Sequence, residues 1–355
     1  MDRRHFFTRA GSAAVAAATL PQLLSRLNAA QANLAADGRT AAELASNEAF
    51  WNAITAQFAP APEFINLEYG YFCPAALPTL EVELREARRL NSQASYYKRT
   101  RRQDDTEGAR ADLARLAGVS AEEVVLTRNT TESLNILYSG LDFEAGDEIV
   151  YSNQDYGSMV EGLRQMRDRH GVVLKEVAIP LHPASDEEVV EVFRQAITPK
   201  TRLLHVTHMI NLTGHVLPVR KISDMAHERG IEVLADSAHA FAHVDFKIPD
   251  LGVDYCGTSL HKWLCSPHGL GMLYVRKDKI EKIWPLMGDT VRPRGDIRKL
   301  ERLGTRPENA LIGLREAIRF HEKIGGEVKQ ARLRHLNQYW TSQVRDLPGV
   351  RINTP

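Results

Sequence analysis

Residues 254–264 read Asp-Tyr-Cys-Gly-Thr-Ser-Leu-His-Lys-Trp-Leu, and Lys262 in this stretch organises our interpretation of the whole chain. Upstream, residues 231–235 form the apolar run Ile-Glu-Val-Leu-Ala, which ends directly before Asp236; a glycine-containing segment follows Lys262 at 267–271. A lysine held in a pocket between such segments loses solvation, so its pKa falls and its amine can form a Schiff base with a carbonyl. For an isolated lysine, a solvated loop position would be the strongly favoured interpretation.

Asp236 strengthens the first interpretation. An aspartate at the end of a buried strand is the group needed opposite a pyridine nitrogen, because its charge keeps that ring protonated and electron-withdrawing. Lys262 and Asp236 together therefore indicate a pocket for a cofactor that carries both a pyridine ring and a carbonyl group.

Length and composition set broad bounds. The 355 residues can bury a large core, with one large domain and a smaller one as the expected organisation. Hydrophobic content of 43%, charged content of 25% and zero formal net charge are typical of a soluble globular protein without a nucleic-acid partner. The three cysteines, at 73, 256 and 265, lack metal-type spacing, which argues against a disulfide framework or a cysteine zinc site.

The N-terminus resembles an export signal. Arg3 and Arg4 form a twin-arginine pattern, and the alanine-rich run at 11–20 is too short to span a bilayer. We therefore expect residues 1–32 to be a twin-arginine signal peptide, with Ala-Gln-Ala at 30–32 as one possible cleavage site. This predicts a periplasmic or secreted protein without a stable membrane anchor, carried by the twin-arginine machinery. An amphipathic N-terminal helix is the alternative.

The next segments carry weaker signals. Residues 33–64 predict a helical segment that packs on a neighbouring domain, because Trp51, Ile54 and Phe58 recur at helical spacing. The aromatic residues within 64–74 could line a pocket or cap a core. A small basic cluster fits a solvated helix face better than an anion-binding site; it comprises Lys98, Arg99, Arg101 and Arg102.

From residue 124 onward, short β-branched runs alternate with helical patterns. The predicted strands cover 124–127, 148–151, 172–179, 202–207, 231–235, 255–258 and 271–275. This alternation predicts an α/β protein with a mostly parallel sheet covered on both faces, and ligands bind beyond the carboxyl ends of such strands. Polar clusters follow five of the strands, at 129–131, 155–156, 211, 236–239 and 259–262. They predict one site at one edge of the sheet.

Each cluster also has an ordinary structural explanation. Thr130 and Thr131 at a helix start can hold a phosphate, although a simple N-cap gives the same pattern. Tyr156 could cover a flat cofactor or fill the core. Asn211 could bond a ring hydroxyl or only its own turn.

Histidines near the predicted site do not predict a metal centre. His239 and His243 are four residues apart, close to Asp236, which weakly suggests metal binding. His205 and His208 differ by an odd number of positions on a strand, so their side chains face opposite ways. We expect no metal ion.

Three motifs carry a family resemblance: Thr-Thr-Glu-Ser at 130–133, Asp-Ser-Ala-His at 236–239 and Ser-Leu-His-Lys at 259–262. In order and strand context they resemble the cofactor motifs of class V aminotransferase-fold enzymes, which depend on pyridoxal 5′-phosphate. Cysteine desulfurases, kynureninases and isopenicillin N epimerases belong to that group. The resemblance implies the PLP-dependent transferase fold type I (aspartate aminotransferase-like), with a large domain over 65–295. Residues 296–355 would begin a small α+β domain, incomplete here.

By this resemblance, Lys262 binds the cofactor covalently and moves protons at Cα, and Asp236 holds the pyridine nitrogen. Tyr156 stacks on the ring. The remaining implied cofactor contacts are Thr131, the Thr130 backbone, Ser259 and His261 at the phosphate, and His239 with Asn211 near the ring hydroxyl. Thr290, in Gly-Asp-Thr at 288–290, resembles a loop that reaches the phosphate of the other subunit, which implies a homodimer with shared active sites.

Tyr156 and His239 replace residues that are often His and Gln in desulfurases, and they favour the epimerase-like branch. The family's arginine for the substrate carboxylate, and a desulfurase's cysteine, are expected beyond Pro355. We therefore predict an enzyme acting at Cα of an amino acid, an epimerase or aminotransferase like isopenicillin N epimerase. A cysteine desulfurase or carbon–sulfur lyase and a catalytically incomplete binding protein of the same fold stay open, as does an unrelated α/β domain.

Overall fold

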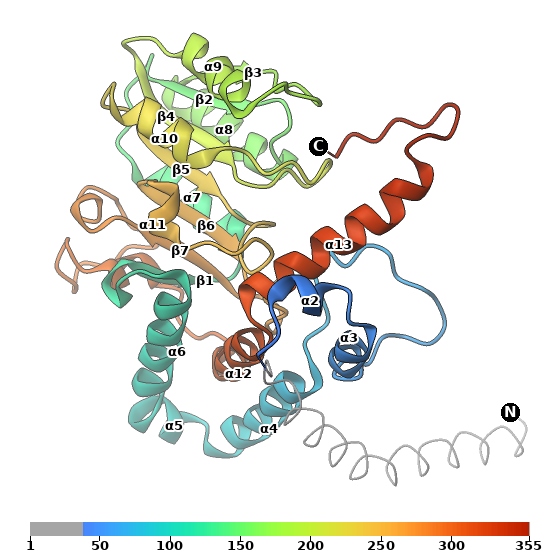
Figure 1. Ribbon diagram of the computed structural model, residues 1–355. Helices are drawn as coiled ribbons and strands as arrows, with labels where there is room; N and C mark the ends of the chain where they lie inside the picture. The colour runs from blue at the N-terminus through green and yellow to red at the C-terminus, as the bar shows by residue number, and fades with distance from the viewer. Residues whose placement is uncertain (1–37, 355) are drawn as a thin grey trace, which may run out of the picture.

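Seven strands form one sheet at the centre of the computed structural model, which describes residues 38–354 (Figure 1). Their spatial order is β1-β7-β6-β5-β4-β2-β3. Neighbours from β6 to β3 run parallel, whereas β7 is antiparallel to both β6 and β1. The strands are β1 (Val124–Thr127), β2 (Glu148–Ser152), β3 (Val173–Val177), β4 (Thr201–Thr207), β5 (Glu232–Asp236), β6 (Tyr255–Ser259) and β7 (Gly271–Val275). The predicted mostly parallel sheet is confirmed.

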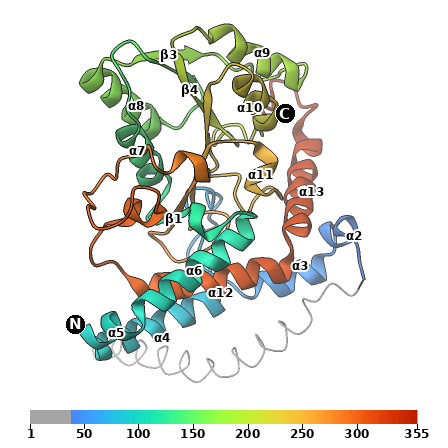
Figure 2. The same ribbon diagram turned by 90° about the vertical axis from the view of Figure 1, so that its left-hand side faces the viewer.

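Helices cover both faces of the sheet (Figures 1 and 2). The α-helices are α2 (Ala41–Ala45), α3 (Glu48–Thr55), α4 (Leu77–Gln93), α5 (Ser95–Thr100), α6 (Arg102–Ala117), α7 (Thr130–Gly140), α8 (Gly157–His170), α9 (Asp186–Ala196), α10 (Val219–His227), α11 (Ile248–Leu251), α12 (Glu308–Ile324) and α13 (Gly326–Val344). Three 3₁₀ turns accompany them: η1 (Ala121–Glu123), η2 (Lys277–Lys279) and η3 (Ile297–Glu301).

The strands are apolar on both sides because each face packs against helices. Leu204 and Val233 join one core cluster with residues of α6, α9, α10, α11 and α12. Their chain neighbours Leu203 and Leu234 join the opposite cluster with residues of α7 and α8. This alternation leaves the strand ends as the place where polar side chains can gather.

The N-terminal segment differs in detail from the expected helical stretch over 33–64. It forms the short helices α2 and α3, separated where Asn47 caps α3 by accepting a hydrogen bond from Phe50 N at 3.0 Å. Phe58 lies beyond the end of α3 and contacts Phe320 edge-on, with ring centroids 5.9 Å apart. The segment therefore packs on α12, although the prolines at 60 and 62 follow instead of more helix.

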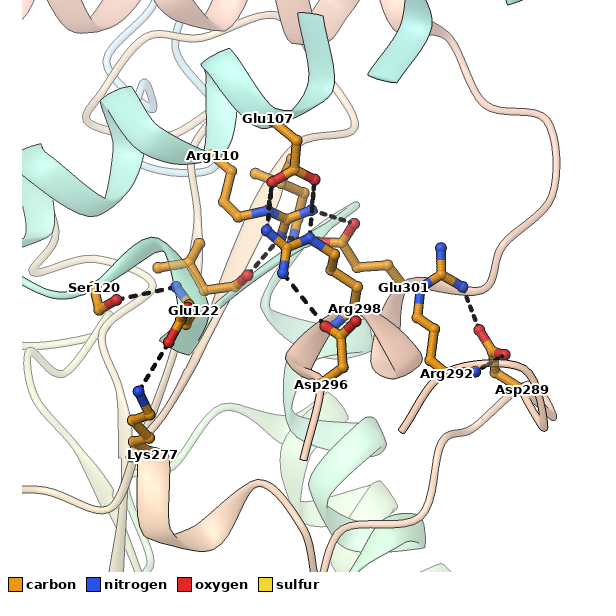
Figure 3. Close-up of polar contacts among 12 residues, drawn as sticks. Glu107, Arg110, Ser120, Glu122, Lys277, Asp289, Arg292, Asp296, Arg298 and Glu301 are labelled. Atoms are coloured by element: carbon orange, nitrogen blue, oxygen red, sulfur yellow. Dashed lines mark hydrogen bonds and ion pairs between the residues drawn. The ribbon is translucent and has the colours of Figure 1, made fainter. Parts of the chain in front are cut away.

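The outer edge of β1 is covered by a charged network rather than by another strand (Figure 3). Glu301 accepts from Leu126 N at 2.5 Å, and Arg110 Nη1 donates to Val124 O at 2.6 Å. Arg110 Nη2 also donates to Glu301 at 2.9 Å, so α6 and η3 clamp the strand together. Pairing the edge groups in this way prevents them from recruiting another chain.

The signal-peptide prediction lies outside the described residues. Within residues 38–354, no helix combines the length and the apolar character that a bilayer crossing needs. The predicted domain boundary between residues 295 and 296 stays a prediction; α12, which follows it, packs on α4 and α6 (Figure 2).

Candidate active site

A pocket of about 180 Å³ lies at the carboxyl ends of the parallel strands, where the polar clusters were expected to meet. Nine of the ten predicted site residues line it, from loops that follow five strands. They are Thr130, Thr131, Tyr156, Asn211, Asp236, His239, Ser259, His261 and Lys262.

Lys262 is a half-buried amine whose hydrogen-bond contact is a histidine and not a carboxylate. Its Nζ lies 2.8 Å from His239 Nε2 and 5.8 Å from the centroid of the Tyr156 ring. Within residues 38–354, no carboxylate forms an ion pair with it. Burial lowers the pKa of the Lys262 amine, against the opposing pull of the Asp236 charge. The amine is therefore biased toward its uncharged, nucleophilic form.

Asp236 ends β5 and is only 4% exposed. Its Oδ1 accepts one hydrogen bond, from Ala238 N at 2.9 Å, and no cation in the described part of the chain pairs with it. Burial raises the pKa of the carboxyl group, while the charges of His205 and Lys262 lower it. A buried carboxylate with free acceptor positions suits the protonated nitrogen of a pyridine ring.

The start of α7 forms an anion cradle with the end of β6. Asn129 caps the helix by accepting from Glu132 N at 2.9 Å. Thr130 N donates to Ser259 Oγ at 2.9 Å, and the Thr130 and Ser259 hydroxyls are 2.8 Å apart. Helix dipole, backbone N–H and two hydroxyls thus meet at one point, as a phosphate requires.

Gly271 allows this cradle to form. A Cβ atom at this position of β7 would lie 2.6 Å from both N and Cα of Asn129, which real structures do not tolerate. Next to it, Leu270 O accepts a hydrogen bond from Nδ1 of His261 at 3.2 Å. The β7 backbone therefore presses against the helix start and fixes the His261 ring beside it.

Hydrogen bonds of Asp155 in the turn after β2 fix the position of Tyr156. Asp155 accepts from Ser152 N at 2.8 Å and from the Thr207 hydroxyl at 2.6 Å, which ties the β2 turn to the end of β4. The Tyr156 side chain is then free to face the pocket, and the residue is 39% exposed. Tyr156 is thus a pocket residue and not part of the core.

Other open alternatives are also decided. Asn211 lines the pocket and makes no side-chain hydrogen bond with any described residue, so it does not merely stabilise its own turn. Tyr71 and Phe72 line the pocket as well, although both are largely exposed. Two of the aromatic residues of 64–74 thus contribute to the lining of the pocket.

Thr290 is the exception among the predicted site residues. It lies in the loop after η2, next to Asp289, which forms an ion pair with Arg292 (Figure 3), and it does not line this pocket. Its proposed role concerns a second copy of the chain and stays a prediction.

Sequence reasoning missed several pocket residues. Thr207 is the last residue of β4, and Ala238 lies between two predicted residues, so the strand-end rule could have found both. Met159 and Met209 carry no such signal. Trp263 does not line the pocket, but its indole contacts His239, and nothing in the sequence pointed to this contact.

The histidines pair with different neighbours. His205 Nδ1 lies 3.1 Å from the Tyr138 hydroxyl, and His208 Nδ1 lies 3.2 Å from Ser237 Oγ. Residues 38–354 contain no group of three side chains suited to hold a metal ion.

Solved structures share this fold. A mutant of C-DES with glycine covalently linked to its PLP cofactor superimposes with a TM-score of 0.76 at 22% identity, covering 83% of this chain and 80% of that one. The cysteine desulfurase CsdA from Escherichia coli gives a TM-score of 0.72 at 22% identity, covering 84% and 78%. These similarities show the fold type I architecture.

Sequence relatives are closer. The isopenicillin N epimerase of Streptomyces clavuligerus is 30% identical over 263 residues, which span 70% of this chain and 66% of that protein. A probable cysteine desulfurase of Mycolicibacterium paratuberculosis is also 30% identical, over 70% of this chain and 38% of that protein. The chain thus spans about two thirds or less of these relatives. The family model for class V aminotransferases matches residues 78–355. This chain is a member of the class V aminotransferase family.

Proposed function

We propose that the protein moves the proton at the Cα atom of an amino acid, as an epimerase or aminotransferase of the isopenicillin N epimerase type. One observation carries the proposal. The Lys262 amine, whose pKa is lowered by burial, lies in a pocket with the buried Asp236 carboxyl group, which has no ion-pair partner among residues 38–354, and with a helix-start anion cradle. A base, an electron-withdrawing support and a phosphate anchor are the three parts that this chemistry needs.

Family membership indicates pyridoxal 5′-phosphate as the cofactor. The residues fit it, because Asp236 has acceptor positions without a donor in the described chain, and the Thr130 and Ser259 hydroxyls, which bond to each other, leave one hydroxyl hydrogen for a phosphate. When bound, this cofactor supplies an electron sink that makes the Cα proton of an amino acid acidic.

Each pocket side chain has a separate role in this proposal. Lys262 binds the cofactor and carries the proton to and from Cα, and Asp236 supports the charge at the far end of the ring. Tyr156 covers the ring. The remaining contacts are assigned as predicted: Thr130, Thr131, Ser259 and His261 for the phosphate, His239 and Asn211 for the ring oxygen.

The three thiols of this chain lie outside the lining of the pocket. All three cysteines lie in the described part of the chain, and none lines the pocket. Cys256 is fully buried, and Cys73 is 6% exposed. A desulfurase needs a thiolate at the substrate sulfur, and these three cysteines do not offer one there.

Proton exchange tests the proposal directly. The loaded enzyme would be incubated in D₂O with a panel of free amino acids and amino-acid-containing peptides, and the Cα proton followed by ¹H NMR. An epimerase replaces the Cα proton with deuterium and yields the opposite enantiomer without a second substrate. An aminotransferase needs an oxo acid, and a carbon–sulfur lyase releases sulfur from cysteine or cystine. Exchange that persists in Lys262→Ala would contradict the proposal.

We also propose a homodimer in which Thr290 reaches the phosphate in the partner's site. Thr290→Glu would then place a negative charge beside that phosphate and inactivate the opposite site. Mixing Lys262→Ala with Thr290→Glu chains should restore about a quarter of the wild-type activity, because half of the random pairs carry one intact site. No recovery from two folded, inactive chains would refute the shared site.

Export through the twin-arginine route is proposed from the sequence alone. Replacing Arg3 and Arg4 with lysine should leave the full chain in the cytoplasm, as judged by fractionation and immunoblotting. Unchanged accumulation in the periplasm or medium would remove this assignment.

A further inference from the structure

Trp263 directly follows Lys262, and its indole contacts the same histidine as the lysine does. Trp263 Nε1 lies 3.3 Å from His239 Nδ1, and His239 Nε2 lies 2.8 Å from Lys262 Nζ. The His243 ring packs on Trp263 with centroids 3.8 Å apart and planes 35° apart, which holds the indole in place. Trp263, His239 and Lys262 are therefore linked by two consecutive hydrogen bonds.

The two hydrogen bonds that link Trp263, His239 and Lys262 allow only one assignment of donors and acceptors. An indole N–H donates and cannot accept, so His239 Nδ1 must be the acceptor. A neutral imidazole that accepts at Nδ1 carries its hydrogen on Nε2. That N–H then donates to Lys262 Nζ. Only an uncharged amine has a lone pair to accept it, because an ammonium group can only donate.

Burial of His239 and Lys262 shifts the pKa values of both side chains in the direction that favours their uncharged forms. Burial, followed by the charges of Lys262 and His243, lowers the pKa of His239 to about 3. The other titratable groups that interact with Lys262 are Asp236 and Cys73, which favour its charged form, and His261. Burial outweighs the charges of Asp236 and Cys73, so the pKa of Lys262 is lowered overall. With its own pKa at about 3, His239 is neutral at pH 7, and its tautomer determines whether Lys262 faces an N–H group or a lone pair.

We propose that Trp263 is a positioning residue that locks His239 as its Nε2–H tautomer and thereby holds the Lys262 amine uncharged. The tautomer itself is independent of the enzyme's reaction; its importance for catalysis rests on the proposed role of Lys262. An amine held this way would be ready at neutral pH to hold the cofactor covalently when that cofactor is bound. Without the indole N–H, His239 can turn its Nε2 lone pair toward Lys262 and stabilise the ammonium form.

The tautomer can be read in the cofactor-free full chain. With ¹⁵N-labelled histidine, the wild type should show His239 protonated at Nε2 and unprotonated at Nδ1, with His239→Ala assigning the signals. Trp263→Phe keeps a ring against His243 but removes the donor, and it should shift the signals toward the other tautomer. A wild-type His239 protonated at Nδ1 would overturn the proposal without any variant.

The lysine provides the second readout. Competitive acylation with acetic anhydride, followed by mass spectrometry, measures the free-amine reactivity of Lys262. In Trp263→Phe it should fall about fivefold at pH 7, the size expected for one hydrogen bond. In the His239→Ala background, the same tryptophan substitution should cause no further change. A drop of equal size in that background would mean that Trp263 acts only through packing, and would overturn the proposal.

Trp284→Phe is the matched control. Trp284 is half-exposed, and its indole donates to Asp142 at 3.3 Å, away from the pocket. It should change neither the His239 signals nor the Lys262 reactivity. If Lys262 fails to bind cofactor yet the tautomer shift appears, the proposed function fails while the Trp263 assignment survives.

Discussion

Lys262 and Arg110 are two basic side chains removed from solvent to different degrees, and their pKa values shift in opposite directions. Arg110 is 1% exposed and donates to Glu301, Glu107 and the Val124 carbonyl, and these carboxylates hold its pKa above the ordinary value despite burial. Lys262 has no carboxylate partner in the described chain, and burial lowers its pKa. Compensation, and not burial alone, separates a structural cation from a reactive amine.

The location of each cation explains the difference. Arg110 lies on α6 against the outer edge of β1, where unpaired strand groups need donors and acceptors (Figure 3). Lys262 follows β6 at the carboxyl ends of the strands, where the fold leaves a cavity. Changes at each position should therefore affect different properties: stability at Arg110, chemistry at Lys262.

Lys262→Ala should have the largest effect. Turnover should fall by at least about a thousandfold, because the variant loses both the covalent anchor and the base. The fold should persist, since no ion pair is broken, and circular dichroism should stay unchanged. Catalysis above a tenth of the wild-type rate would contradict the role of Lys262.

Arg110→Met should cost about 3–5 kcal/mol of unfolding free energy, because it removes the main cationic partner of the buried Glu301 carboxylate, which keeps only the more distant Arg306, and the donor to the Val124 carbonyl. Urea unfolding measures this, and activity per folded molecule should hold. The control is Arg115→Met: Arg115 is 55% exposed in its ion pair with Glu322, and exposed pairs contribute about 1 kcal/mol or less. Equal losses for both variants would refute the comparison.

Asp236→Ala should reduce turnover about a hundredfold while reducing cofactor loading less, because its charge acts mainly on the electron-rich state at Cα. Loading is measured by absorbance and turnover by Cα exchange. If the two fall by the same factor, Asp236 only anchors the ring.

Lys262→Met should show the smallest effect, in the pH dependence of stability of the cofactor-free chain. Because burial lowers the folded pKa, the unfolded chain binds a proton that the folded chain lacks, from that lowered pKa up to about 10.4. Wild-type stability therefore rises with pH across this window. The variant should be more stable than the wild type near pH 7, with the gain shrinking toward pH 10. A pH-independent difference would show that Lys262 stays charged when folded.

The sequence predicted the strands and most of the pocket because strand periodicity and the strand-end rule are local signals. Asp236, Ser259 and Lys262 each follow or end an apolar run, so their convergence could be expected. The resemblance to class V aminotransferases supplied their separate roles.

Side-chain contacts between distant segments could not be predicted in this way. Arg110 and Glu301 are 191 residues apart, and neither stands out in the sequence. Trp263 was given no role from the sequence, because its hydrogen bond to His239 depends on how two loops pack. The break between α2 and α3 was missed because the cap at Asn47 competes with helical periodicity.

Covalent trapping of the cofactor tests the central claim most directly. The purified enzyme would be reduced with borohydride, digested and analysed by mass spectrometry. The account predicts a yellow band near ~420 nm that reduction removes, with the cofactor mass on the peptide containing Lys262. Lys329 is the main alternative attachment site for the cofactor. Burial also lowers the pKa of its amine, and it donates to the carbonyl of Trp263, next to Lys262. Cofactor on Lys329, or a colourless protein after added pyridoxal phosphate, would contradict the account.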